Sequence, residues 1–164
     1  MIRLATQADL PAIDQLILQK AQAFQAAGKT QWAKYLEPSR TDFVTHDVTN
    51  GTVYVYETNG AITGSVSLIP PTTWDENLWD DSRGAVYLHR LVVDDRMKGQ
   101  QVGEQLMRHA LAATSDRIRL DCVASNSFLN AYYPPFGFRY IGERDGFSLF
   151  EKRGLTLTRR QRVR

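Results

Sequence analysis

The sequence predicts an α/β domain in which a mixed, mostly antiparallel sheet carries helices on both faces. An apolar strand at 85–93 precedes an amphipathic helix from about 101 to 113 and a second strand at 117–124. Such a strand–helix–strand unit implies a parallel pair of strands. Alternating stretches joined by short turns on either side of this unit imply antiparallel hairpins. With 164 residues, of which 43% are hydrophobic, the chain can bury a substantial core.

The N-terminal half contains the start and stop signals of two helices and one hairpin. A short strand at 2–5 is followed by a helix to about residue 27, which a Thr-x-x-Asp pattern and a proline introduce and a glycine ends. A second helix occupies about 39–50 and stops before another glycine. The β-rich stretches 52–58 and 61–69 then meet at an Asn-Gly turn, which is typical of a hairpin.

The C-terminal half alternates strands with one long and one short helix. We expect 70–84 to form a loop and 85–93 to form a strand buried on both faces. The helix that follows has apolar residues at spacings of 4, 4 and 3, as one face of an α-helix requires. The remaining expected elements are a strand, a short helix broken by two prolines and a final hairpin, at 117–124, 126–137 and 138–152.

Composition restricts the classes of protein to which the chain can belong. A single cysteine excludes an internal disulfide framework and favours a reducing compartment. The N-terminus has no apolar signal segment, and no stretch of the chain reaches 18 consecutive apolar residues. We therefore expect a soluble cytoplasmic protein that makes no contact with a membrane.

The end of the chain differs in charge from the rest. Six basic residues and no acidic residue follow Glu151, whereas the preceding part is mildly acidic even though the whole chain has a net charge of +2. We expect a single domain over 1–154 and a basic tail over 155–164. The tail is interpreted as a solvated segment, with contact to nucleic acid as the weaker alternative.

A glycine-containing turn lies between the central strand and the long helix. The free N–H groups and the dipole at a helix N-terminus favour an anion, above all a phosphate, and Lys98 and Arg96 would add positive charge. The segment matches neither the phosphate-binding GxxxxGK[ST] pattern nor the dinucleotide-binding GxGxxG pattern. On its own, this turn is a weak indication of phosphate binding.

Two motifs make the assignment more specific. The sequence LHRLVVDDRMKGQQVGEQLM resembles the acetyl-CoA-binding segment of the GNAT superfamily of N-acetyltransferases, which has a hydrophobic strand, a loop of the form [QR]-x-x-G-x-[GA] and a helix. Asn126, Tyr133, Gly137 and Phe138 match a second pattern of such families, N-x(6)-Y-x(3)-G-F. The resemblance extends from residue 2 to about residue 151 and implies the GNAT fold.

The resemblance implies that acetyl-CoA binds to the end of the strand, to the loop and to the first turn of the helix. Lys98 stands where the family has Arg or Gln, and Gln101 stands where it has a middle glycine. The Gln101 side chain would point away from the CoA pyrophosphate or bond to it, and a lower affinity for CoA is one consequence. The residues that we expect to bind acetyl-CoA are Leu91, Val92, Val93, Lys98, Gly99, Gln100, Gln101, Val102, Gly103, Glu104, Asn126 and Tyr133.

Acetyl transfer to an amine needs a base, donors for the developing oxyanion and a proton donor for the departing thiolate. Tyr133 occupies the position of the family's general-acid tyrosine, and a phenol stays protonated at neutral pH. The resemblance places an oxyanion donor at the backbone N–H of Val92 or its neighbour. His89 is the candidate base, because its strand resembles the HLHALAV strand of serotonin N-acetyltransferases. The alternatives are a core aromatic residue for Tyr133 and a hydrogen-bonded core histidine for His89.

Several other side chains have two interpretations. Asn126 contacts the pantetheine arm by analogy, caps the following helix, or does both. Cys122 is interpreted as a core residue, His46 and His109 as solvated, and no cluster has the spacing of metal ligands. The resemblance places the acceptor beside the loop before the central strand, whose aromatic and acidic residues suit a cationic amine; the alternative is an ordinary acidic surface loop. The residues that we expect to bind the acceptor are Trp32, Trp74, Trp79, Asp80 and Asp81.

The predicted function is direct transfer of the acetyl group of acetyl-CoA to a primary amine, without a covalent acetyl-enzyme. We expect the acceptor to be a small molecule. The closest alternative acceptor is a protein N-terminus or a lysine. A non-catalytic acyl-CoA-binding or partner-binding module is a further alternative, which Gln101 motivates. The sequence leaves the oligomeric state open, a homodimer included.

Overall fold

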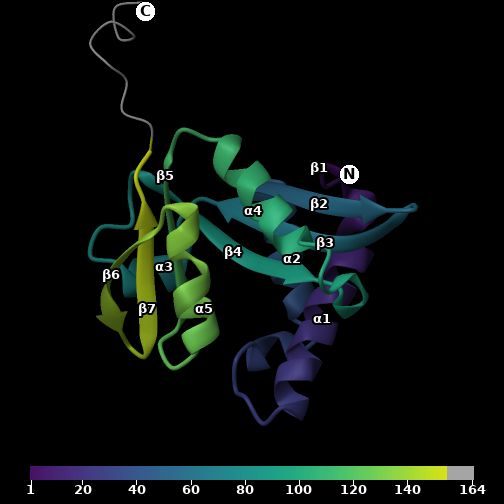
Figure 1. Ribbon diagram of the computed structural model, residues 1–164, viewed down its shortest axis with the longest axis horizontal. Coiled ribbons are helices and arrows are strands. Elements are labelled where there is room, and N and C mark those ends of the chain that lie inside the picture. Colours follow the sequence, from purple (N-terminus) through teal and green to yellow (C-terminus); the bar gives the residue numbers. More distant parts are fainter. Residues whose placement is uncertain (155–164) are drawn as a thin grey trace, which may run out of the picture. The chain divides into compact units, whose positions relative to one another are not determined.

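The computed structural model describes residues 1–154, which form parts of two compact units (Figure 1). Unit 1 consists of Met1–Pro70 and Tyr87–Ala110. Among the described residues, unit 2 consists of 71–86 and 111–154. The basic tail expected over 155–164 lies outside the described residues.

Unit 1 is built on four antiparallel strands in the order β1-β2-β3-β4. Asn59 and Gly60, both with positive φ, make the tight turn between β2 and β3 that the Asn-Gly pair predicts. A 3₁₀ turn, η2 (Ala33–Leu36), lies between the first two helices. The elements are β1 (Ile2–Leu4), α1 (Leu10–Ala26), α2 (Arg40–Asn50), β2 (Thr52–Thr58), β3 (Ala61–Ile69), β4 (Ala85–Val93) and α4 (Val102–Ala112).

Helices cover both faces of this sheet (Figure 1). On one face, α1 and α2 bury a core formed by Ile13, Leu16, Ile17, Ala21, Tyr35, Val44, Val53, Val55 and Val92. On the other face, the ring of Tyr54 lies 4.7 Å from that of His109 in α4. Gly64 allows α4 to approach β3 closely, because a Cβ at Gly64 would lie 2.9 Å from both Val102 and Leu106. The two helices and α4 therefore pack on opposite faces of this sheet.

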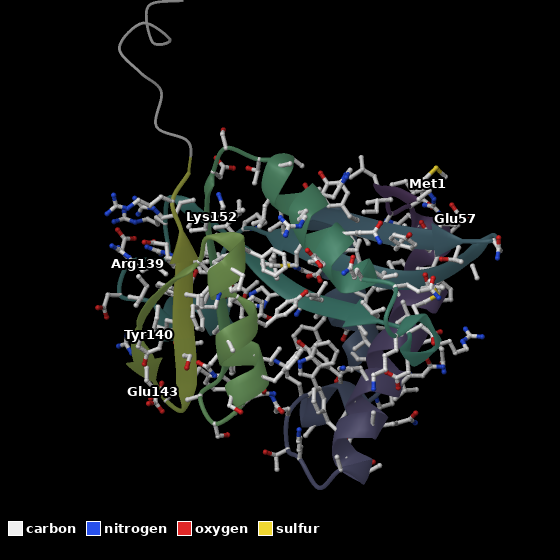
Figure 2. All side chains as sticks on the ribbon, viewed as in Figure 1. Met1, Glu57, Arg139, Tyr140, Glu143 and Lys152 are labelled. Carbon is white, nitrogen blue, oxygen red and sulfur yellow. The ribbon has the colours of Figure 1, made fainter. Side chains whose placement is uncertain are left out.

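The N-terminus is fastened to this sheet by a small network of charges. Arg3 donates to the Asp9 carboxylate at 2.8 Å and to Glu57 at 3.0 Å. The Thr6 N–H also donates to Asp9, at 2.8 Å, which is the Thr-x-x-Asp start that the sequence predicts. The hydrogen bond from Arg3 lowers the pKa of Asp9 to about 2. Beside this network, the terminal amine of Met1 donates to the carbonyl of Glu57 (Figure 2).

Unit 2 contains three antiparallel strands in the order β5-β7-β6. Residues on alternate positions of β5 and β7 face opposite sides, so that Phe147 and Asp121 lie toward α3 while Phe150 and Cys122 lie on the other face. Arg139, Tyr140 and Glu143 follow one another along the exposed edge strand (Figure 2). The elements are α3 (Thr73–Leu78), β5 (Arg117–Val123), α5 (Ser127–Tyr132), β6 (Arg139–Arg144) and β7 (Phe147–Lys152).

Two sequence expectations need correction. The segment 70–84 is not entirely a loop, because α3 begins after Thr72, whose N–H and hydroxyl both donate to Asp75. The strand β4 is not buried on both faces along its whole length, since His89 and Leu91 are only half-buried. The second difference coincides with an irregularity in β4 that shapes the candidate site.

Candidate functional site

β4 contains a β-bulge at its centre. Ser67 pairs with His89 and Ser65 pairs with Val92, so two residues of β4, Arg90 and Leu91, stand opposite the single residue between the two serines. Arg90 adopts a left-handed backbone with φ of 53°, which bulges of this kind normally give to glycine. The extra residue interrupts the regular ladder between β4 and β3 at Arg90 and Leu91.

The turn after β4 is a rigid, hydrogen-bonded structure. Asp94 accepts from the Arg96 N–H at 2.9 Å and from its guanidinium at 2.7 Å. The positive charge of Arg96, which we expected to assist an anion, is therefore paired with a carboxylate. The Gln100 N–H donates to the Met97 carbonyl at 3.1 Å. Lys98 has an exposed side chain on the loop itself.

The residue that departs from the family pattern adopts the conformation of a glycine. Gln101 has φ of 58°, and its side chain is exposed. Gly99 also has positive φ, with open space where a Cβ would stand. The loop thus requires a left-handed residue immediately before α4, which explains the glycine in the family pattern. A glutamine satisfies this requirement at a cost of about 1–2 kcal/mol in backbone strain.

The first turn of α4 presents the donors that an anion needs. The first helical hydrogen bond runs from the Gln105 N–H to the Gln101 carbonyl at 3.0 Å. The N–H groups of Val102, Gly103 and Glu104 therefore lie outside the ladder of the helix. The carboxylate of Glu104 pairs with Arg108 at 2.9 Å, so Glu104 can contribute its backbone rather than its charge. These features fit a pyrophosphate such as that of CoA.

Substitutions of Gln101 should separate backbone conformation from side-chain contacts. Gln101→Gly removes the strain and should leave the Kd for CoA within about threefold of the wild-type value. Gln101→Val places a β-branched residue at positive φ and should weaken binding by about tenfold or more. Titration calorimetry with CoA measures both. Equal affinity in the valine variant would show that the left-handed backbone is not needed for binding.

Tyr133 lies in unit 2 among aromatic rings. Its ring is 7% exposed and lies 6.1 Å from the ring of Phe138 and 5.9 Å from that of Phe150. Burial raises the pKa of the Tyr133 phenol well above its ordinary value, and the nearby Cys122 acts in the same direction. The phenol is therefore held as a proton donor. Both interpretations of Tyr133, a core residue and an acid, are compatible with this position.

Cys122 is buried on the same face of the unit 2 sheet. Burial, with a smaller contribution from Asp121, raises the pKa of its thiol to about 11. A thiol that stays protonated at neutral pH is a poor nucleophile. This environment agrees with the interpretation of Cys122 as a core residue.

Asn126 caps the short helix of unit 2. Its side-chain oxygen accepts from the Leu129 N–H at 3.0 Å, as the N-cap interpretation predicts. The contact with the pantetheine arm stays a prediction. Gly137 follows the 3₁₀ turn η4 (Pro134–Phe136), has φ of 98° and directs the chain into β6. The second sequence motif thus combines a helix cap, a buried phenol and a left-handed turn.

The loop before β4 contains paired rather than unpaired charges. Asp80 accepts from Arg144 at 2.8 Å, and Asp81 pairs with Arg83 at 3.1 Å. Trp79 is a buried residue whose ring is covered by Arg119, with the guanidinium carbon 4.5 Å from the ring centroid. These pairings reduce the negative charge that Asp80 and Asp81 would offer to a cation, and the role of the loop in acceptor binding stays a prediction.

Trp74 is the more exposed aromatic residue of that segment. Its indole N–H donates to Asp121 at 3.1 Å, and its ring lies 5.0 Å from that of Phe147 while 37% of the residue stays exposed. In unit 1, Trp32 packs edge-on against Phe24 and Tyr35. Both tryptophans are therefore fixed in orientation by neighbouring rings.

The histidines occupy the predicted kinds of position. His89 is half-buried on β4 and stands opposite Ser67, one residue before the bulge. His46 and His109 are exposed on α2 and α4. The sequence did not reveal which residues bind the Arg90 side chain, because they lie in segments that are far from Arg90 in the chain.

No helix in residues 1–154 is long and apolar enough to cross a membrane. The pattern of the acetyltransferase (GNAT) family matches residues 17–138. The chain is 32% identical over 156 residues to the uncharacterized N-acetyltransferase YesJ of Bacillus subtilis (strain 168), a match that covers 90% of this chain and 87% of YesJ.

Solved structures agree with this match. A GNAT-family acetyltransferase of Listeria monocytogenes is 29% identical, with a TM-score of 0.73 and 93% of each chain covered. The PaiA N-acetyltransferase of Thermoplasma acidophilum, solved in complex with coenzyme A, is 14% identical with a TM-score of 0.68, covering 93% of this chain and 98% of its own. The predicted fold class is confirmed. The chain therefore belongs to the GNAT family of acetyltransferases, which transfer an acyl group from acyl-CoA to an amine acceptor.

Proposed function

We propose that this enzyme transfers the acetyl group of acetyl-CoA directly to a primary amine of a small molecule. The observation that carries the proposal is the loop 98–103, whose left-handed residues Gly99 and Gln101 precede the free N–H groups of α4. This geometry supports pyrophosphate binding in spite of the missing glycine. The single cysteine supports a reducing compartment such as the cytoplasm.

In this proposal, residues of both motifs bind acetyl-CoA, which supplies an acetyl group activated as a thioester. The backbone N–H groups of Val102, Gly103 and Glu104 donate to the pyrophosphate, and Lys98 adds a positive charge. Asn126 contacts the pantetheine arm while it continues to cap α5. The backbone of Leu91, Val92 and Val93 runs beside the thioester end.

Three groups perform the chemistry in the proposal: a backbone N–H at the bulge, the Tyr133 hydroxyl and the His89 side chain. A backbone N–H at the bulge, at Val92 or its neighbour, donates to the acetyl carbonyl as negative charge develops on its oxygen. Tyr133 gives a proton to the departing thiolate, and the raised pKa of its buried phenol keeps that proton available at neutral pH. Cys122, whose thiol stays protonated, takes no part, which supports direct transfer rather than a covalent acetyl-enzyme.

His89 removes the proton from the acceptor ammonium, directly or through water. Its place on β4 beside the bulge supports this role. We expect His89→Gln to lower kcat/KM by about 10²–10⁴-fold, the usual contribution of a general base. A kcat/KM close to the wild-type value would assign the proton transfer to another residue or to water, and His89 would then be a hydrogen-bonded strand residue.

The acceptor is the least constrained part of the proposal. Fixed aromatic rings at Trp32 and Trp74 support binding of a cationic amine, because a π face attracts a cation. The carboxylates of Asp80 and Asp81 contribute less than we expected, since each is paired with an arginine. The alternative acceptor is the N-terminus or a lysine of a protein.

An acetylation assay over a panel of amines tests the proposed function. The panel contains small primary amines, secondary amines and peptides whose N-terminus or lysine is the only free amine. Free CoA thiol is measured together with the mass of the acetylated product. We expect turnover with small primary amines. Turnover with peptides alone would establish the alternative acceptor, and thiol release without any acetylated amine would contradict N-acetyl transfer.

A further inference from the structure

In the bulge of β4, Arg90 adopts a left-handed backbone conformation that an arginine does not favour. Other non-glycine residues with positive φ include Asn59 and Asp145, which lie in tight turns and belong to residue types that tolerate this backbone. Arg90, with φ of 53°, lies within a strand. A strained residue persists only when its surroundings fix it, so the contacts of the Arg90 side chain need explanation.

The Arg90 guanidinium is fixed by one carboxylate and one phenol. Arg90 Nε donates to Asp47 Oδ2 at 2.6 Å, and Nη2 donates to Asp47 Oδ1 at 2.5 Å. Its Nη1 donates to the Tyr35 hydroxyl at 3.1 Å. Only 7% of the Arg90 side chain and 2% of that of Asp47 are exposed. This bidentate pair is therefore shielded from water and defines both the position and the plane of the guanidinium.

The partners of Arg90 come from the helical segment of unit 1. Asp47 lies on α2, Tyr35 lies on η2, and the ring of Phe43 on α2 covers the guanidinium at 5.5 Å. The segment is itself held in place, since Arg40 of α2 pairs with Asp14 of α1 at 3.1 Å. The Arg90 side chain thus attaches the strand backbone at the bulge to α2 and η2.

We propose that Arg90, Asp47 and Tyr35 form a clamp that holds the β4 bulge and so aims the backbone N–H of Leu91 and Val92 at the reacting carbonyl. This inference rests on the proposed function. Arg90 and Asp47 are then positioning residues, which touch neither acetyl-CoA nor the amine. The clamp also links the conformation of α2 and η2 to the rate of transfer.

The test removes the clamp without leaving a buried charge. In the double variant Arg90→Gly/Asp47→Asn, glycine still permits the left-handed backbone, and asparagine keeps the shape of the carboxylate. We expect kcat to fall by about 10- to 100-fold, in line with the loss of an aligned oxyanion donor, while the Kd for CoA stays within about threefold. Amide exchange at Leu91 and Val92, measured without ligand, should accelerate at least about tenfold relative to Val55 in β2.

A matched control removes a neighbouring ion pair that does not touch β4. Arg40→Gln/Asp14→Asn removes the ion pair between α1 and α2 and should leave kcat within about threefold. If the double clamp variant does not fold, Arg90→Lys replaces it: lysine keeps the charge but loses the bidentate fork, so kcat should fall and exchange at Leu91 should rise.

The outcomes separate the clamp from the proposed function. Unchanged exchange at Leu91 and Val92, or faster exchange with unchanged kcat, would overturn the clamp as a positioning device. Wild-type protein that acetylates no amine would instead overturn the proposed function, and the exchange measurement would still show whether the ion pair holds the bulge. A fall in kcat shared equally by the Arg40 control would assign the effect to general loosening of the helices, which contradicts the proposal.

Discussion

Replacing Tyr133 by phenylalanine is expected to lower kcat by about 10²–10⁴-fold, the usual contribution of a general acid. The change removes only the hydroxyl from a ring that packs against Phe138 and Phe150, so the surrounding core should stay intact. The Kd for acetyl-CoA should change by less than about threefold. Steady-state kinetics with a good amine acceptor, together with calorimetric titration, measure the two quantities.

Tyr132→Phe provides the matched control. Tyr132 is the neighbouring tyrosine, half-buried and stacked on Phe128 with centroids 5.9 Å apart. Its substitution should leave kcat within about threefold of the wild-type value. Equal and small effects in both variants would identify Tyr133 as an aromatic core residue and leave the thiolate to be protonated by water.

Replacing Gly103 by proline should abolish measurable binding of CoA, with a loss of at least about 100-fold in affinity. Gly103 is the second residue of α4, where its N–H makes no bond within the helix. Proline is therefore compatible with the helix at this position, but it removes a donor and places a ring where the pyrophosphate would approach.

Gly103→Ala is the control for this prediction, because alanine keeps the N–H and adds a single methyl group. We expect a smaller loss of affinity in the alanine variant than in the proline variant. Circular dichroism would establish that both variants are folded. A folded proline variant that binds CoA as tightly as the wild type would remove the first turn of α4 from the binding site.

Local signals in the sequence predicted most of the elements. The Asn-Gly pair at Asn59 produced the expected hairpin, and Thr6 with Asp9 introduced the first helix through the expected hydrogen bond. These features succeed because the donor and the acceptor lie within four residues of each other. α3 was missed because its six residues lie in a segment rich in prolines and tryptophans, although Thr72 and Asp75 formed the same kind of start signal.

The irregular part of the candidate site depends on long-range contacts. No local pattern indicates that Arg90 is left-handed, because Asp47, which fixes its side chain, is 43 positions away in the chain. The pairings of Asp80 with Arg144 and of Trp79 with Arg119 also join distant parts of the chain, so the sequence does not show that these side chains are paired. The glutamine at position 101 led us to expect a lower affinity for CoA, but its backbone adopts the left-handed conformation that a glycine would provide.

The most direct measurement follows the backbone amide signals of the protein by NMR while CoA is added. We expect the largest shifts at Gly99, Gln101 and the first residues of α4, from Val102 to Glu104. Shifts at Leu91 and Val92 should appear when acetyl-CoA replaces CoA. Saturable binding of CoA that leaves the signals of 98–104 unchanged would exclude this loop from the CoA site, because the ligand would then occupy another part of the protein.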